Sequence, residues 1–510
     1  MRALISVSNK EGIVKLAEEL EALGVELIST GGSYQRLKDS GITVTNVSDI
    51  TKFQECLDGR VKTLHPTIHA GILAVRSNES HMNTLKELDI TPIDIVIINL
   101  YPFKETISTT GVTLEEAIEN IDIGGPTMLR AGAKNYQDVA VVTDPKDYDL
   151  LLTELKEKKE ISLETKTYLA AKVFEETAFY DSLIAEYLRK RQGIQFPEKL
   201  TVPLEKAQGL RYGENPHQAA CFYKEPIPMK GAITEATQLA GKELSYNNIG
   251  DANAAINLVK EFPEQPCVVA IKHATPCGVA LGMDLFTAYE KAYACDPQSI
   301  FGGIVATNQL IDEKTAKKMC EIFLEVIIAP SFSPEALEVF QAKENLRLLK
   351  LPHLIRGQEA GLTMKKVTGG MLVQEMDVLP MSSEYNICTE RIPSGSEITD
   401  MIFAMKVCKH TASNAIVFAK DGATIAVGGG QVSRVWSVEN CADHMLSDGM
   451  GAVMASDAFF PFPDSIAIAA KAGIKAIIQP GGSKRDQSCI DACNQHGIAM
   501  IMTDVRHFRH

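Results

Sequence analysis

Apolar segments of strand length alternate with amphipathic helical segments at the start of this chain. The expected strands are residues 3–7, 25–29, 42–47, 94–100 and 139–142, and the expected helices are residues 12–23, 34–39 and 163–191. Strands that alternate with helices predict a parallel sheet covered by helices on both faces. In such a sheet, ligands bind beyond the carboxyl ends of the strands, where loops lead into helix N-termini.

The length of 510 residues indicates more than one domain. The polar, proline-containing stretch 192–203 is the expected boundary after an N-terminal domain, residues 1–200. Beyond it, two segments share an order of strand, polar break, strand and glycines. The first is CVVAIKHATPCGVAL followed by FGGIVATN, and the second is NAIVFAKDGATIAVGGG followed by AGIKAIIQPGGS. This similarity predicts an internal duplication into residues 203–365 and 366–510, with a junction near 357–370.

Composition narrows the classes of function. Hydrophobic residues make up 45% and charged residues 23%, as in ordinary globular proteins. The net charge of −14 disfavours a broad surface that binds nucleic acid or membrane, but it does not exclude a local basic pocket for an anionic small molecule. The 11 cysteines form no CxxC pair, and the N-terminus shows no secretory signal. We expect a cytoplasmic protein with reduced thiols and small-molecule substrates.

Two loops after expected strands carry the groups that bind phosphate. The first contains Ser6, Ser8, Asn9 and Lys10, and the second contains Thr30, Gly31, Gly32 and Ser33. Hydroxyls, glycine backbone and a lysine suit an anion at a helix N-terminus. For either loop alone, helix capping and turn formation explain the residues equally well. Together the loops favour a phosphate site.

The segment GRVKTLHPTIH places Arg60 and Lys62 near His65 and His69. The histidines have the i,i+4 spacing of a zinc pair, but Pro66 lies between them and no third ligand is evident. A cationic pocket is therefore favoured over a metal site.

Two further motifs contribute polar and backbone groups. NLYPF follows an expected strand, and in IDIGGPTMLRAGAKN the residue Asp122 precedes glycines at an expected helix start. Lys134 comes about three helical turns later, so its distance from Asp122 depends on the fold.

These motifs resemble the inosine monophosphate (IMP) cyclohydrolase domain of the bifunctional purine biosynthesis family. The resemblance implies a methylglyoxal-synthase-like fold that closes the ring of a formylated aminoimidazole carboxamide ribonucleotide (AICAR) without a cofactor. It implies catalysis by Lys134 with Lys62, Tyr101 and Asp122. The implied nucleotide-binding residues are Ser8, Asn9, Lys10, Thr30, Gly31, Gly32, Ser33, Arg60, Thr63, Pro102 and Ile123.

In the second part of the chain, Lys272 and His273 follow an apolar strand and precede an expected turn at Pro276 and Gly278. The Pro-Cys pair invites comparison with zinc deaminases, but Ala280 stands where their second cysteine would be, which argues against that class. A base such as His273 beside a cation such as Lys272 suits a reaction in which a poorly nucleophilic amine attacks a carbon atom.

Several motifs of this part together resemble the formyltransferase domain of the same family. They are KHATPCG, RYGENPHQ, SIFGGIVA, EVIIAP, SDAFFPFPDS, IQPGGS and RHFRH. The resemblance implies two cytidine-deaminase-like subdomains without zinc, 10-formyltetrahydrofolate as cosubstrate, and a homodimer with the site across its interface. His273 is implied as the base, and Lys272 as the group that stabilises the charged transition state or protonates the leaving N10 of the folate. The implied AICAR-binding residues are Arg211, Tyr212, His273, Gly302, Glu325, Asn414, Phe459 and Arg506, and the implied folate-binding residues are Arg434, Asp464, Ser483 and Lys484.

Some alternatives stay open at this point. Glu325 replaces an aspartate of some family members, and the single tryptophan, Trp436, fits a packing role better than the folate pocket. A ligand-sensing module without catalysis, or a bifunctional scaffold with one inactive site, remains an alternative to the enzyme. The combination of Lys62, Tyr101, Asp122 and Lys134 with the Lys272–His273 dyad in a second domain favours an enzyme over a sensor.

Overall fold

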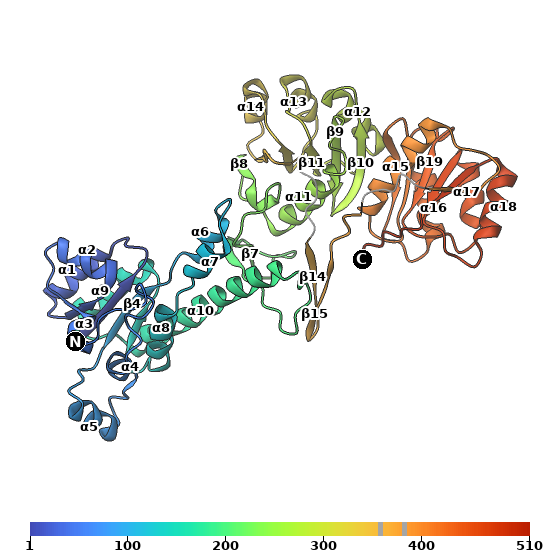
Figure 1. Cartoon of the computed structure of the whole chain (residues 1–510). Coiled ribbons are helices and arrows are strands. Elements are labelled where there is room, and N and C mark those ends of the chain that lie inside the picture. The colour runs from blue at the N-terminus through green and yellow to red at the C-terminus, as the bar shows by residue number, and fades with distance from the viewer. Residues whose placement is uncertain (355–360, 380–384) are drawn as a thin grey trace. The chain divides into compact units, whose positions relative to one another are not determined.

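The computed structural model describes residues 1–354, 361–379 and 385–510, which form two compact units (Figure 1). Unit 1 is Met1–Glu205 with Glu225–Ile227, and unit 2 is Lys206–Lys224 with Pro228–His510. Gly357, at the start of the expected junction between duplicated halves, lies outside the described residues. Within the described ranges, no helix has the length and apolar character that crossing a membrane requires.

Unit 1 is built on a parallel sheet. Its elements are β1 (Arg2–Val7), α1 (Ile13–Ala22), β2 (Glu26–Ser29), α2 (Gly31–Asp39), β3 (Val44–Asn46), α3 (Val47–Thr51), α4 (Pro66–Leu73), α5 (Glu79–Glu87), β4 (Ile95–Asn99), α6 (Phe103–Ser108), α7 (Leu114–Glu119), α8 (Gly124–Lys134), β5 (Ala140–Val142), α9 (Tyr148–Lys158) and α10 (Leu163–Arg191). The strand order is β3-β2-β1-β4-β5, and every pairing is parallel. The predicted parallel sheet is confirmed.

Side chains alternate along β1 between two apolar cores. Ala3 and Ile5 pack on the face covered by α1 and α9, whereas Leu4 packs on the face covered by α4, α8 and α10. Both faces of the sheet are therefore covered, as the near-continuous apolar strands predict.

One expected boundary is wrong in a way that matters for the site. The helix expected at residues 34–39 begins at Gly31, so the glycines form its first turn rather than a loop. Thr30 is extended and caps the helix without a side-chain hydrogen bond. Glycine has a low intrinsic helix propensity, which is why the pattern placed the start too late.

Unit 2 contains most of the remaining strands. Its elements are β6 (Glu205–Leu210, which begins at the last residue of unit 1), β7 (Ala220–Lys224), β8 (Thr237–Ala240), α11 (Tyr246–Val259), β9 (Cys267–Lys272), β10 (Thr275–Leu281), α12 (Leu285–Cys295), β11 (Ile304–Thr307), α13 (Glu313–Met319), β12 (Val326–Ala329), α14 (Pro334–Gln341), β13 (Arg347–Lys350), β14 (Leu362–Val367), β15 (Gly370–Glu375), β16 (Asn386–Ile387), α15 (Gly395–Lys409), β17 (Ile416–Lys420), β18 (Ala423–Gly428), α16 (Arg434–His444), β19 (Val453–Ser456), α17 (Asp464–Lys471), β20 (Ala476–Gln479), α18 (Asp486–His496) and β21 (Ala499–Met502).

The same order of elements occurs twice in unit 2. A helix, a two-stranded hairpin and three helix-strand pairs make up the first half, residues 246–350, and again the second half, residues 395–502. Among the described residues, twelve strands form one sheet in the order β16-β21-β20-β19-β17-β18-β10-β9-β11-β12-β13-β8. The halves meet where β10 pairs antiparallel with β18.

Strand directions bring functional segments of both halves to one edge of this sheet, which we call the dyad edge. It holds the carboxyl end of β9 and the amino ends of β11 and β12, because β9 runs antiparallel to β11. It also holds the carboxyl ends of β19, β20 and β21, because each pairing between β9 and β19 is antiparallel.

Close packing at Gly278 generates a stability prediction. A Cβ at Gly278 on β10 would overlap the backbone carbonyl oxygen of Ala292 on α12, which cannot move aside as a flexible side chain could. Gly278→Ala should destabilise unit 2 by about 1–3 kcal/mol through overpacking. Gly395→Ala is the matched control, since nothing lies within 4 Å of its added Cβ. Calorimetric unfolding of the full chain measures both, and equal stabilities of the two variants would contradict the prediction.

Candidate active sites

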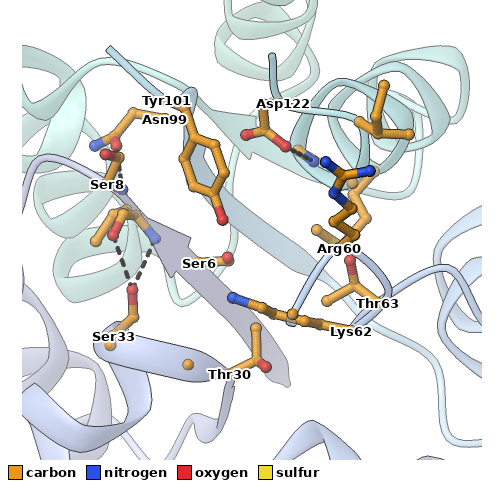
Figure 2. Close-up of a pocket in the computed structure, with 18 of the residues that line it drawn as sticks. Ser6, Ser8, Thr30, Ser33, Arg60, Lys62, Thr63, Asn99, Tyr101 and Asp122 are labelled. Carbon is orange, nitrogen blue, oxygen red and sulfur yellow. Dashed lines mark hydrogen bonds between the residues drawn. The ribbon is translucent and has the colours of Figure 1, made fainter. Parts of the chain in front are cut away.

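A cavity of 480 Å³ opens at the carboxyl ends of β1, β2 and β4 in unit 1 (Figure 2). It lies where the strand order reverses direction, between β1 and β4, which is the usual ligand position in an open α/β sheet. The predicted residues that line it are Ser8, Lys10, Thr30, Gly31, Gly32, Ser33, Arg60, Lys62, Thr63, Tyr101, Asp122 and Ile123. Its volume suits a small-molecule ligand.

Asn99 and Ser33 fasten the loop after β1. The Asn99 Oδ1 accepts the N–H of Ser8 at 2.6 Å and that of Asn9 at 2.9 Å. Ser33 is buried, and its hydroxyl accepts the N–H of Val7 and donates to the Val7 carbonyl. The Ser33 hydroxyl, expected to face a phosphate, therefore holds the loop instead. Asn99 was missed as a lining residue, although it stands in the NLYPF motif.

Two ammonium groups lie at the N-terminus of α2. Lys62 Nζ lies 3.5 Å from the position that a Cβ of Gly31 would take, and Lys10 Nζ lies 3.6 Å from that of Gly32. The absence of side chains lets both lysines approach free backbone N–H groups at the positive end of the helix dipole. Such an arrangement of positive charge and free N–H groups suits an anion such as phosphate.

Asp122 lies across the cavity under the start of α8. Its Oδ1 accepts the Gly125 N–H at 2.9 Å, and a Cβ at Gly125 would overlap the carboxylate. The Asp122 N–H donates to the hydroxyl of Tyr180, which donates to the Asn120 carbonyl. Burial raises the pKa of Asp122, while hydrogen bonds from Gly125 and Tyr101 and the charge of Lys62 oppose the rise. Backbone hydrogen bonds thus hold Asp122 in place, and a buried carboxyl group with a raised pKa is typical of functional sites.

Figure 2 shows Tyr101 and Lys62 extending toward the middle of the same cavity. At its rim, Arg60 forms an exposed ion pair with Glu119, another lining residue that the sequence did not indicate. Two predicted residues, Pro102 and Asn9, are not among the lining residues. Pro102 caps α6 beside Tyr101, and the Asn9 N–H donates to Asn99 Oδ1.

Lys134 does not reach this cavity. It is exposed at the carboxyl end of α8, about 15 Å along the helix from Gly124 at a rise of 1.5 Å per residue. The histidine pair also differs from a metal pair, because His65 caps α4 by accepting the Thr67 N–H through Nδ1. Nowhere in residues 1–354, 361–379 and 385–510 do three His, Cys, Asp or Glu side chains gather as metal ligands.

In unit 2, Lys272 is the last residue of β9, and His273 and Ala274 form the turn to β10. The turn expected at Pro276 and Gly278 is wrong, since both lie within β10. His273 and Ala274 have φ of +52° and +57°, a left-handed conformation that costs about 1–2 kcal/mol for each residue with a Cβ. Such strain is typical of functional sites.

Lys272 and His273 line a cavity of 370 Å³ together with residues of the second half. Asn440 and His444 on α16 face them there, and neither was indicated by the sequence. The Lys272 ammonium donates to the Phe301 carbonyl at 2.8 Å and lies 3.0 Å from the place of a Gly302 Cβ. Gly302, with φ of +66°, therefore leaves room for this ammonium.

The remaining predicted residues fall into two groups along the dyad edge. The first-half group is Arg211, Tyr212, Lys272, His273, Gly302 and Glu325. Asn247 of α11 donates a hydrogen bond to the loop that carries Arg211. Glu325 forms an ion pair with Arg347 at 2.8 Å. The second-half group is Asn414, Arg434, Phe459, Asp464, Ser483, Lys484 and Arg506, which follow or precede β17, β19, β20 and β21.

Arg434 differs from the other members of the second-half group. It is buried, pairs with the fully buried Asp457, and donates to Ser456 Oγ at 2.8 Å and to Asn414 Oδ1 at 2.8 Å. Its guanidinium thus orients Asn414 from inside the protein rather than facing a ligand. Trp436 on α16 is 50% exposed, which fits the partly buried position expected for it.

The outer members of the two groups are far apart along the sheet. Six strand spacings separate β12, which follows Glu325, from β19, which precedes Phe459. At about 4.8 Å each, they amount to roughly 29 Å. One mononucleotide therefore cannot touch both Glu325 and Phe459 of the same chain.

Comparison with known proteins identifies the family of the chain. The model of the AICARFT/IMPCHase bienzyme family (AICAR formyltransferase and IMP cyclohydrolase) matches residues 132–444, and that of the MGS-like (methylglyoxal-synthase-like) domain matches residues 12–127. The bifunctional purine biosynthesis protein PurH of Acetivibrio thermocellus is 58% identical over 513 aligned residues, covering 100% of this chain and 99% of the relative. The chain belongs to the AICARFT/IMPCHase bienzyme family.

A second PurH relative agrees with this assignment. The PurH protein of a Thermoanaerobacter species is 56% identical over 510 residues, again with 100% of this chain and 99% of the relative covered. The crystal structure of ForH matches 36% of this chain and 95% of its own at 36% identity, with a TM-score of 0.33. In this bienzyme family member, the MGS-like match contains the cavity residues from Thr30 to Gly125, whereas the loop after β1 precedes it.

The raised pKa of Asp122 predicts a pH dependence. The carboxylate is lost as pH falls through a pKa above that of an ordinary aspartate, about 3.9, so ring closure should decline on acidification before ordinary aspartates titrate. Because the charge of Lys62 lowers this pKa, Lys62→Gln should move the acid limb of kcat/KM to higher pH. Circular dichroism at each pH controls for unfolding. Rates that stay level down to the ordinary aspartate range would contradict the prediction.

Proposed function

We propose that the unit 1 cavity closes the purine ring and that the dyad edge of unit 2 transfers the formyl group. As a member of the bienzyme family, the chain is a bifunctional enzyme of the last two steps of purine nucleotide synthesis. It carries the AICAR formyltransferase and IMP cyclohydrolase activities. The observation that supports the first assignment most is the convergence of Lys62, Tyr101 and Asp122 on one cavity with a phosphate-binding end.

In ring closure, the carboxamide nitrogen of formyl-AICAR attacks the formamide carbon of the same molecule and water leaves. Holding both groups in contact replaces much of the entropic barrier. The N-terminus of α2 with Lys10 and Lys62 would hold the phosphate, and Asp122 would accept the amide proton. Tyr101 and Lys62 would stabilise the developing oxyanion and protonate the departing oxygen. This proposal excludes Lys134, because α8 keeps it at the other end of the helix.

In formyl transfer, His273 would take the proton of the AICAR amine as its nitrogen attacks the formyl carbon. Lys272 would stabilise the negative charge at the transition state. As the bond between the formyl carbon and N10 of the folate breaks, the Lys272 ammonium or the protonated His273 would protonate the departing N10. The family implies a folate-type cosubstrate, for which we propose 10-formyltetrahydrofolate near Asp464, Ser483 and Lys484. The equal order of elements in the two halves supports the proposal of duplicated, cytidine-deaminase-like subdomains.

We also propose a homodimer that completes the formyl-transfer site. Residues of both halves are needed around one substrate, yet roughly 29 Å separates their outer members in one chain. A two-fold dimer would place the first half of one chain opposite the second half of its partner and form two equivalent sites.

Separate assays of the two steps test the assignments. His273→Ala should lower formyl transfer by about 10²–10⁴-fold and leave cyclisation of added formyl-AICAR unchanged. Lys62→Ala should lower cyclisation by about 10²-fold and leave formyl transfer unchanged. Absorbance-monitored turnover measures both steps, and Lys134→Ala is the matched control, expected to stay within about twofold because it is remote.

Three outcomes would change these assignments. A cyclisation loss in Lys134→Ala as deep as in Lys62→Ala would return Lys134 to the catalytic set. Full formyl transfer by His273→Ala would remove the dyad. A folded wild-type chain that binds nucleotide but converts none would replace the enzyme with a ligand sensor.

Mixed dimers test the shared site. Chains carrying His273→Ala and chains carrying Asn414→Ala should each be inactive in formyl transfer. After co-expression, mixed dimers would contain one intact site and one doubly altered site, restoring about a quarter of wild-type activity on statistical mixing. No recovery in verified mixed dimers would place both residues in a site within one chain.

A further inference from the structure

The hairpin turn that carries His273 occurs a second time in unit 2 without the histidine. Lys272 pairs with Thr275 across the turn formed by His273 and Ala274. In the second half, Lys420 pairs with Ala423 across the turn formed by Asp421 and Gly422, with φ of +52° and +69°. Both are two-residue turns with positive φ at each central position, the requirement of a type I′ hairpin.

The lysine before each turn is held in the same way. Lys272 Nζ donates to the Phe301 carbonyl at 2.8 Å, and Lys420 Nζ donates to the Met450 carbonyl at 2.7 Å. The second turn is therefore a structural counterpart of the first, and differences between them indicate what the histidine requires.

Each turn is also held by an aspartate from the preceding helix. Asp251 is the sixth residue of α11, and its Oδ1 accepts the Ala274 N–H at 2.7 Å. Asp400 is the sixth residue of α15, and its carboxylate accepts the N–H of Asp421 at 2.9 Å and of Gly422 at 2.8 Å. A helix side chain thus fixes the turn backbone in both halves.

The two turns differ in their own preference for this conformation. Asp-Gly is a favoured sequence for a type I′ turn, so the second-half turn adopts positive φ readily. His273 and Ala274 both carry a Cβ and disfavour it. The dyad turn therefore depends on an external hydrogen bond more than its counterpart does, and Asp251 supplies that bond.

We propose that Asp251 is a positioning residue for His273, acting through the backbone of Ala274. This rests on the proposed role of His273 in formyl transfer. Without the carboxylate, the turn would relax from the left-handed region and carry the imidazole away from the substrate amine. Because a displacement of about 1 Å can cost 10²-fold in rate, the effect should appear in kcat.

Substitution of the two aspartates in the full-length chain tests this proposal. Asp251→Ala should lower kcat of formyl transfer by about 10–100-fold, with KM for AICAR and the rate of cyclisation changed less than about twofold. Asp400→Ala, the matched control, removes the same kind of bond from a turn without a histidine and should leave kcat within about twofold, whatever its melting temperature.

Two rescue variants separate positioning from general destabilisation. Asp251→Asn keeps a side-chain oxygen acceptor and should retain kcat within about threefold. In Asp251→Ala, a second change of Ala274→Gly should recover at least about tenfold, because glycine adopts positive φ without strain. Circular dichroism and calorimetry confirm that each variant is folded.

Several results would overturn the proposal. Asp251→Ala with normal kcat, or Asp400→Ala with an equal loss, would show that the bond does not position His273. Failure of both rescue variants would do the same. If His273→Ala retained full formyl transfer, the proposed function of the dyad itself would be refuted. If His273→Ala lost formyl transfer while Asp251→Ala kept a normal kcat, only the positioning role of Asp251 would be refuted.

Discussion

The antiparallel pairing of β10 with β18 is the interaction on which unit 2 depends. Ala280 lies opposite Ala423, and the Thr424 hydroxyl accepts the N–H of Val279 at 2.9 Å and contacts its carbonyl oxygen at 3.2 Å. This pairing joins two halves of equal element order into one sheet. Because it is antiparallel, the hairpin turn of one half shares an edge with the strand carboxyl ends of the other. The residues of formyl transfer can therefore occupy one edge.

Unit 1 reaches a binding site by a different physical route. Its strands are parallel, so their carboxyl ends and the following helix N-termini meet on one side of the sheet. Backbone N–H groups at α2 and α8 supply polarity without side chains, and glycines there admit Lys62 and Asp122. Burial raises the pKa of Asp122 while backbone donors hold it in place. Packing and proton chemistry are thus combined in one residue.

Much of the fold could be predicted because it follows local patterns. The strands of unit 1 are uninterrupted apolar runs, and α10 has the predicted bounds because its periodic pattern is long and its Ser162 cap is strong. The start of α2 was placed too late because Gly31 and Gly32 have low helix propensity, and the turn at His273 was missed because residues with a Cβ disfavour positive φ. Tertiary contacts overrode propensity at both positions, and both lie at a site.

The sequence by itself determined the parallel sheet, the chemical groups of both sites and the resemblance to a family, because these depend on residue type and short-range order. Only the tertiary structure decided which groups meet. It brought Lys62 and Asp122 to one cavity while α8 carried Lys134 away, and it buried Arg434 against Asp457. Helix rise, strand direction and the spacing of paired strands set these distances. The identity of the individual residues does not reveal them.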